Sequence, residues 1–213
     1  MAYVDKWGYV SEIADTMSRI IRESGLKVDL VDLRHTRQSK WPAINDYTGV
    51  ILISFGRTKL LSFWTGKARK FASIYVAPFE KEKVIGFFRS DPYAYQGLLD
   101  PISAKEKFGK SILKICNFIP DYYEEFGPVL DFSRKSKVKR DSREILKDSA
   151  KMIAKATGLE FEFKGFNDFR DWNRIEEVSK EIIEQLQKGK PCTSCGSIVP
   201  IGAEFCKNCG NKM

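Results

Sequence analysis

This sequence of 213 residues has no long apolar run, no leader pattern and only one histidine. No apolar run approaches the roughly 20 residues that cross a bilayer. The N-terminus lacks the basic-then-apolar order of a signal peptide, so we expect a cytoplasmic protein. His35 is the only histidine, and no other side chain stands out as a catalytic acid, base or nucleophile.

Cysteine is also scarce, and its spacing excludes a disulfide framework. Of five cysteines, Cys116 lies alone in an apolar helical pattern. The other four form two Cys-x-x-Cys pairs near the C-terminus, at Cys192, Cys195, Cys206 and Cys209. Paired cysteines at this spacing point two sulfurs at one metal ion, and two pairs complete a tetrahedral shell. The pattern predicts one structural zinc ion.

Glycine follows each pair, at Gly196 and Gly210, which suits a backbone that turns through positive φ. The segment resembles the short zinc-ribbon modules found at the ends of many prokaryotic proteins. Catalysis by this zinc is not expected, because four cysteines leave no open coordination position. With zinc bound the module is close to neutral, so contact with a protein is favoured over nucleic acid.

Positive charge is in excess, with a formal net charge of +8. Part of the excess lies in one basic segment, which contains Arg134, Lys135, Lys137, Lys139, Arg140 and Arg143. One interpretation is a solvated loop and helix start, as is usual for such runs. The other is peripheral contact with an anionic surface, such as acidic lipid headgroups.

The first 100 residues alternate between strand and helix periodicity, which is typical of βαβ units on a parallel sheet. We expect strands at residues 1–4, 27–33, 49–55, 83–88 and 128–132. We also expect a helix with Trp64, Ala68, Phe71 and Ile74 on its inner face. The first strand is short for a central strand, which usually has about five or six residues. Either residues before Met1 are missing, or the sheet is truncated in its middle.

Several motifs occur in the order seen in flavodoxins. Residues 2–8 with Glu12, Ile13 and Ala14 look like a first strand, phosphate loop and helix. Asp46 and Tyr47 lead into the strand 49–54, and the helix around residues 64–71 and the Asp171-Trp172 helix start follow. Over residues 1–187 the chain is similar to the flavodoxin-domain family that includes menaquinone-dependent protoporphyrinogen dehydrogenases.

That resemblance implies a doubly wound α/β fold with a parallel five-stranded sheet in the order 2-1-3-4-5. It further implies flavin mononucleotide (FMN), with the phosphate in the first loop and the ring between the loops after strands three and four. A redox protein or a quinone would be the partner. The implied FMN-binding residues are Lys6, Trp7, Gly8, Tyr9, Val10, Ser11, Ser54, Phe55, Gly56, Arg57, Ser90 and Tyr93.

The first loop departs from the flavodoxin pattern. Asp5, Trp7 and Val10 stand where hydroxyl side chains are expected, and the charge of Asp5 would repel a phosphate dianion. Two interpretations therefore stay open: an FMN-binding oxidoreductase or electron carrier, and a flavodoxin-like scaffold that has lost FMN and acts with its zinc ribbon as an interaction module. The expected division is residues 1–187, a linker at 188–191 and the ribbon at 192–213.

Overall fold

The fold was obtained as a computed structural model, which describes residues 1–55, 66–90, 96–200 and 203–212. Its centre is a parallel sheet of five strands in the order β2-β1-β3-β4-β5. The order is that of the flavodoxin-like fold, so the predicted fold class is confirmed. The strands are β1 (Ala2–Val4), β2 (Val31–Asp32), β3 (Gly49–Ser54), β4 (Val84–Arg89) and β5 (Tyr122–Glu125).

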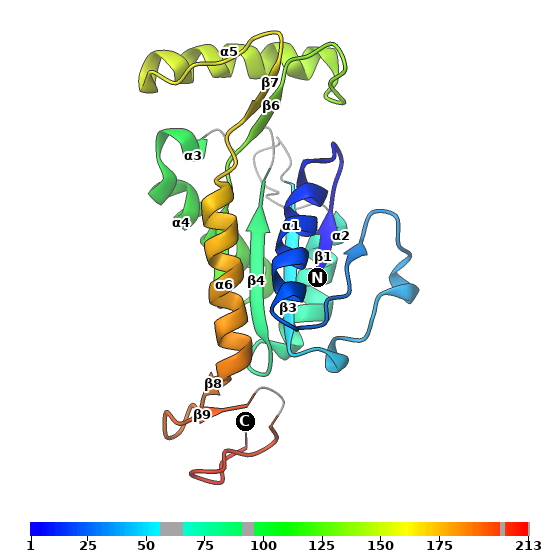
Figure 1. The fold of residues 1–213 in the computed structure, drawn as a ribbon, viewed down its shortest axis with the longest axis vertical. Coiled ribbons are helices and arrows are strands. Elements are labelled where there is room, and N and C mark those ends of the chain that lie inside the picture. Colours follow the sequence, from blue (N-terminus) through cyan, green and yellow to red (C-terminus); the bar gives the residue numbers. More distant parts are fainter. Residues whose placement is uncertain (56–65, 91–95, 201–202, 213) are drawn as a thin grey trace.

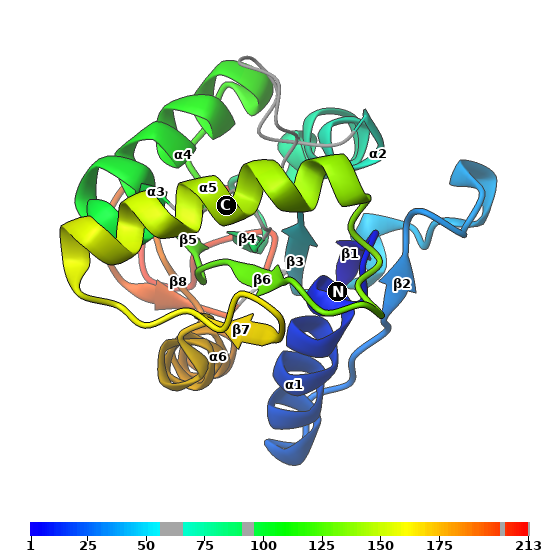
Figure 2. The same ribbon diagram turned by 90° about the horizontal axis from the view of Figure 1, so that it is seen from above.

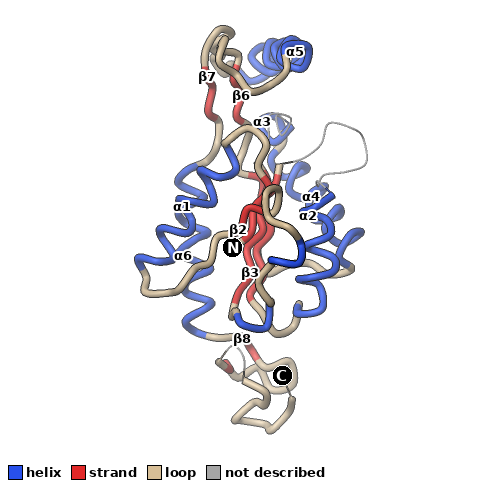
Figure 3. Tube along the Cα trace, turned by 90° about the vertical axis from the view of Figure 1, so that its right-hand side faces the viewer, coloured by secondary structure: helices blue, strands red, loops and turns tan. Residues whose placement is uncertain are grey.

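Helices cover both faces of this sheet. Figure 3 shows α1 (Tyr9–Glu23) and α6 (Trp172–Lys188) on one side, and α2 (Gly66–Lys70) and α4 (Pro101–Cys116) on the other. The inner strands β3 and β4 are buried on both faces, as this arrangement requires. The shorter helical elements are η1 (Gln38–Lys40), η2 (Ile44–Asp46), η3 (Phe71–Val76), η4 (Ala77–Phe79) and α3 (Gln96–Leu99).

A second substructure lies beyond the carboxyl ends of the sheet strands. Strands β6 (Val129–Asp131) and β7 (Phe166–Asp168) pair antiparallel, and α5 (Arg140–Thr157) lies between them in sequence. Figure 1 shows this unit at one end of the molecule, and Figure 2 shows α5 passing across the ends of the strands. We call β6, α5 and β7 the cap. It lies over the edge where such folds place their ligands.

The cysteine-rich tail lies at the opposite end of the molecule from the cap (Figure 1). It begins directly after α6, with a two-stranded antiparallel sheet of β8 (Lys190–Pro191) and β9 (Ile198–Val199). In the part of the chain that the structure describes, no helix has both the length and the apolar character needed to cross a membrane.

The predicted fifth strand at residues 128–132 is wrong. The fifth sheet strand is Tyr122–Glu125, while Val129–Asp131 belongs to the cap hairpin. Two adjacent glutamates hide the true strand from a pattern based on apolar content. Their charges are satisfied by distant residues: Arg174 lies 2.7 Å from Glu124, and Arg89 lies 2.7 Å from Glu125.

Two other expectations also need correction. The second strand is Val31–Asp32 and not the whole of residues 27–33, because its partner β1 has only three residues. Ile74 does not face the core and is 58% exposed. The chain over Phe71–Val76 is a π-helix, whose wider turn rotates the buried face away from α-helical spacing.

Candidate functional site

The candidate site is the loop between β1 and α1, at the point where the order of the strands reverses. Residues 5–8 connect Val4 to the first helical residue, Tyr9. Gly8 has φ of 100°, a conformation that glycine adopts without strain. Backbone N–H groups at such a helix start attract anions. In this fold class the loop is therefore the expected phosphate site.

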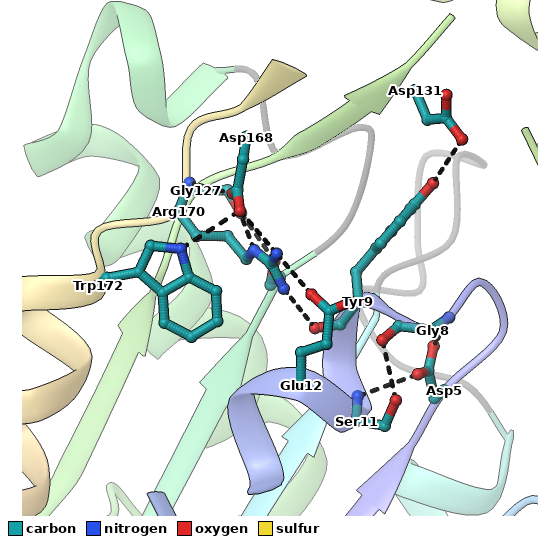
Figure 4. A network of polar contacts seen from close by, with 11 residues as sticks. Asp5, Gly8, Tyr9, Ser11, Glu12, Gly127, Asp131, Asp168, Arg170 and Trp172 are labelled. Atoms are coloured by element: carbon teal, nitrogen blue, oxygen red, sulfur yellow. Dashed lines mark hydrogen bonds and ion pairs between the residues drawn. The ribbon is translucent and has the colours of Figure 1, made fainter. Parts of the chain in front are cut away.

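The carboxylate of Asp5 accepts hydrogen bonds from these N–H groups (Figure 4). One oxygen accepts from Trp7 and Gly8, both at 2.9 Å, and the other accepts from Ser11 at 3.0 Å. Asp5 is buried, with 8% of its surface exposed. The first anion held by this loop is thus a side chain of the protein itself.

The environment keeps Asp5 ionised. Burial by itself raises the pKa of the carboxyl group, but hydrogen bonds from Ser11, Gly8 and Trp7 together hold it below its ordinary value. Carboxylates that accept several backbone N–H bonds titrate low for this reason. At neutral pH the loop therefore already contains one negative charge.

A phosphate dianion does not fit this loop as it stands. It would have to displace the Asp5 carboxylate from its three donors and would then lie beside the negative charge of that carboxylate, which repels it. The hydroxyl groups nearby are also engaged with the protein's own carbonyl groups. Ser11 donates to Gly8, Ser54 to Phe55 and Ser90 to Gly127, at 2.8 to 3.0 Å.

Other predicted FMN-binding residues have structural partners. Trp7 is buried against Phe55, with ring centroids 5.0 Å apart and an edge-on geometry. Val10 is in the core, and the amine of Lys6 lies over the ring of Trp7. Gly56, Arg57 and Tyr93, as well as Trp64 of the expected helix, lie outside the described residues.

Tyr9 connects the loop to the cap. Its hydroxyl donates to Asp131 at 3.4 Å, and its ring packs against Phe166 at 6.0 Å between centroids. Burial and the nearby charge of Asp131 raise the pKa of Tyr9, so the phenol stays protonated. Lys137 also reaches the loop from the cap, since a Cβ on Gly8 would lie 3.5 Å from its amine.

Arg170, which no sequence pattern singles out, joins the cap to α1 (Figure 4). Its guanidinium is 98% buried and donates to the Tyr9 carbonyl at 2.8 Å, to Glu12 at 2.7 Å and to Asp168 at 2.7 Å. It also stacks on Trp172, with 4.4 Å to the ring centroid. No local pattern predicts this role, because Glu12 is 158 positions away in the sequence.

The basic segment is exposed at most of its charged positions. Lys137, Lys139 and Arg140 are all exposed, as are Arg134 and Lys135. Arg143 is half-buried and donates to the Ser133 carbonyl. The structure is compatible with both interpretations of this segment, and contact with an anionic surface stays a prediction.

The second candidate site is the set of four cysteines in the tail. Their sulfur atoms all lie within 4.8 Å of one another. Cys192 and Cys209 are 3.6 Å apart between sulfurs, as are Cys195 and Cys206. A tetrahedral ion with metal–sulfur bonds near 2.3 Å would separate its sulfurs by about 3.8 Å. The donor set therefore fits one metal ion.

The two halves of this metal site repeat the same backbone hydrogen bonds. The N–H of Gly196 donates to the Cys192 carbonyl, and the N–H of Gly210 donates to the Cys206 carbonyl, both at 2.8 Å. Both glycines have φ near 73°. This repetition explains the glycine after each cysteine pair, since each knuckle needs one residue in the left-handed region.

Comparison with known proteins adds little to this geometry. No family model and no curated protein matches the sequence. Among solved structures, the chain is similar to the solution structure of two-electron reduced flavodoxin from Megasphaera elsdenii. The two are 12% identical with a TM-score of 0.37, over 60% of this chain and 83% of that chain. The fold assignment therefore depends on the strand order of this chain itself.

Proposed function

We infer that this protein is a flavodoxin-like scaffold that does not hold FMN in its first loop and that acts, with its metal-binding tail, as a protein-interaction module. One observation carries the inference: the Asp5 carboxylate accepts hydrogen bonds from the N–H groups of Trp7, Gly8 and Ser11. Site chemistry outweighs fold analogy in a choice between functions.

An FMN-binding oxidoreductase or electron carrier is the second candidate. Two observations favour it: the flavodoxin-like strand order, and the cations of Lys6 and Lys137 beside the loop. A redox protein or a quinone would then be the partner. In that case the flavin supplies the redox chemistry, and the protein supplies binding and tuning.

The metal ion in the tail is proposed to be zinc with a structural role. Four thiolates in a tetrahedron are typical of structural zinc sites. A module of about 20 residues buries too little to fold unaided, so the ion supplies most of its folding free energy. Ile198 and Phe205 remain 60% and 55% exposed beside the cysteines, and they are the proposed contact residues for a protein partner.

The first experiment measures FMN and inorganic phosphate binding by calorimetry and by flavin absorbance. We expect the purified protein to be colourless and to bind neither ligand. Asp5→Ser should gain phosphate affinity, because it frees the loop N–H groups and removes the repelling charge. Asp15→Ser is the matched control. Asp15 is an exposed aspartate on α1, and its replacement by serine changes the net charge by the same amount.

Protein isolated with bound flavin would contradict the scaffold proposal and support the second candidate.

The interaction role is tested by cross-linking in cell extracts, with partners identified by mass spectrometry. Ile198→Ser and Phe205→Ser should lose partners that Ile102→Ser keeps, with unchanged metal content in all three. Ile102 is a suitable control because it is 76% exposed on α4. Partners that all three variants retain would exclude the tail as the contact surface.

A further inference from the structure

The basic segment carries most of the excess positive charge of the chain. Residues 134–143 contain six cations and one acid, Asp141, and so carry +5 of the net charge of +8. The segment connects β6 to α5 and includes the first turn of that helix. It therefore lies entirely in the cap, and the proposed interaction role does not use it.

The protein's own acids do not neutralise this charge. Five of the six cations, all except Arg143, are exposed. In the described parts of the chain, none of these five has a carboxylate within ion-pair distance. The acids that follow on α5 are paired with other cations: Glu144 lies 3.1 Å from Lys147, and Asp148 lies 2.9 Å from Lys151. Cations without acidic partners attract an anion from outside the protein.

The cap forms one end of the molecule. Figure 1 shows α5 lying across the long axis at that end, and Figure 2, which looks onto it, shows α5 in front of the central sheet. The cap thus presents the side of a helix of 18 residues to an approaching partner. A surface of this shape suits a partner that is broad and flat.

Two large apolar side chains are exposed on the same helix. Ile145 is 65% exposed and Met152 is 67% exposed. They are seven positions apart, so they lie on one side of α5, two turns from each other. Leu146, Ala150 and Ile153 are the buried apolar residues that pack α5 onto the protein. Exposed apolar side chains beside unpaired cations are the combination that binds anionic lipid interfaces.

We propose that the cap binds the surface of a membrane that contains anionic lipids, through the exposed cations of the basic segment and the side chains of Ile145 and Met152. The cations contact the lipid phosphate groups, and the two apolar side chains enter the headgroup region. Nucleic acid offers the same phosphate charge, but its backbone has no apolar layer to receive these side chains. The pairing of Glu144 and Asp148 with lysines reduces the repulsion between these acids and the lipid.

The inference goes beyond the proposed interaction role and does not depend on it. The cysteine-rich tail lies at the opposite end of the molecule (Figure 1), so binding through the cap holds Ile198 and Phe205 away from the membrane. Loss of lipid binding would leave the cross-linked partners of the tail unchanged. The two proposals can therefore fail separately.

Sedimentation with lipid vesicles tests the proposal on the full chain. We expect binding to phosphatidylcholine vesicles that contain about one-third phosphatidylglycerol, no detectable binding to phosphatidylcholine alone, and a steep loss of affinity as salt is raised. Lys135→Gln with Lys139→Gln should lower the affinity about 25-fold, since each cation near an anionic membrane contributes about fivefold. The matched control, Lys114→Gln with Lys180→Gln, removes exposed lysines from α4 and α6 and should lower the affinity less than about twofold.

A second pair of variants tests the apolar contribution. Ile145→Ser with Met152→Ser should lower the affinity at least about fivefold, because two apolar side chains no longer leave water. Ile74→Ser with Leu113→Ser is the control, because these side chains are 58% and 47% exposed outside the cap. Thermal unfolding checks that every variant folds as the parent protein does.

Equal losses of affinity in the cap variants and their controls would overturn the proposal, as would vesicle binding that does not need the anionic lipid. A short DNA duplex tests the other source of phosphate. If the duplex binds, and Lys135→Gln with Lys139→Gln weakens that binding while anionic vesicles do not bind, the cap recognises nucleic acid and the proposal is wrong.

Discussion

The guanidinium of Arg170 lies 2.7 Å from the carboxylate of Glu12, although 158 positions of sequence separate the two residues. The contact joins the end of the cap to the first turn of α1. Arg170 also donates to the Tyr9 carbonyl, in the same turn. The cap is therefore attached directly beside the Asp5 loop.

Replacing Arg170 with Met should destabilise the protein strongly. The side chain is 2% exposed, and its removal leaves Asp168 and the Tyr9 carbonyl without their shared donor. Loss of one partner from a buried pair costs about 3–5 kcal/mol. Glu12→Gln should cost about 1 kcal/mol or less, because the Glu12 side chain is 55% exposed. Urea unfolding measures both values, and equal costs would contradict this account of the contact.

Asp5→Asn should lower stability at neutral pH by about 1–3 kcal/mol, since hydrogen bonds to a charged acceptor are lost. The pKa of Asp5 is lower in the folded protein than in the unfolded chain. Its stabilising effect is therefore present above the ordinary carboxyl pKa of about 3.9 and is lost as the pH falls through the lower folded value. The variant should lack this acid dependence. Identical acid titrations of stability for the two proteins would show that the Asp5 contacts do not form.

Cys206→Ser should release the metal ion and unfold the tail, while the sheet domain still unfolds cooperatively. The reason is that the tail has a separate small cluster of buried residues around Cys192, Val199 and Cys206. Cys116→Ser is the control and should keep the metal, because Cys116 is buried in the sheet domain and burial raises its pKa to about 12. Metal content and calorimetry check both. Unfolding of the whole chain by Cys206→Ser would show that the tail is not an independent unit.

The chain beginning at Met1 should lose stability as the pH is lowered from about 8 to about 6. Burial lowers the pKa of the Met1 amino group from 8.0 to about 6, so the unfolded chain binds this proton more readily than the folded protein. Chemical denaturation across this range, on protein whose mass shows that Met1 is retained, measures the effect. Protein acetylated at the Met1 amino group should lack it, because the resulting amide does not titrate in this range. The same pH dependence in both proteins would contradict a buried amine.

The sequence by itself determined the features that depend on neighbouring residues. The Cys-x-x-Cys spacing with its following glycines is a local pattern, and the structure brings those four sulfurs together. The alternation of strand and helix periodicity likewise determined the α/β class and the parallel sheet. The sequence also shows that the first strand is short, because only four residues precede Asp5.

The tertiary structure decided what depends on distant partners. Glu124 and Glu125 stand in a sheet strand because Arg174 and Arg89 reach them from other elements. Asp5 in the sequence is a charge that would repel phosphate, and only the folded loop makes it the acceptor for three N–H groups. The role of Arg170 has no local signature, because its partners Tyr9 and Glu12 meet it only when the chain has folded.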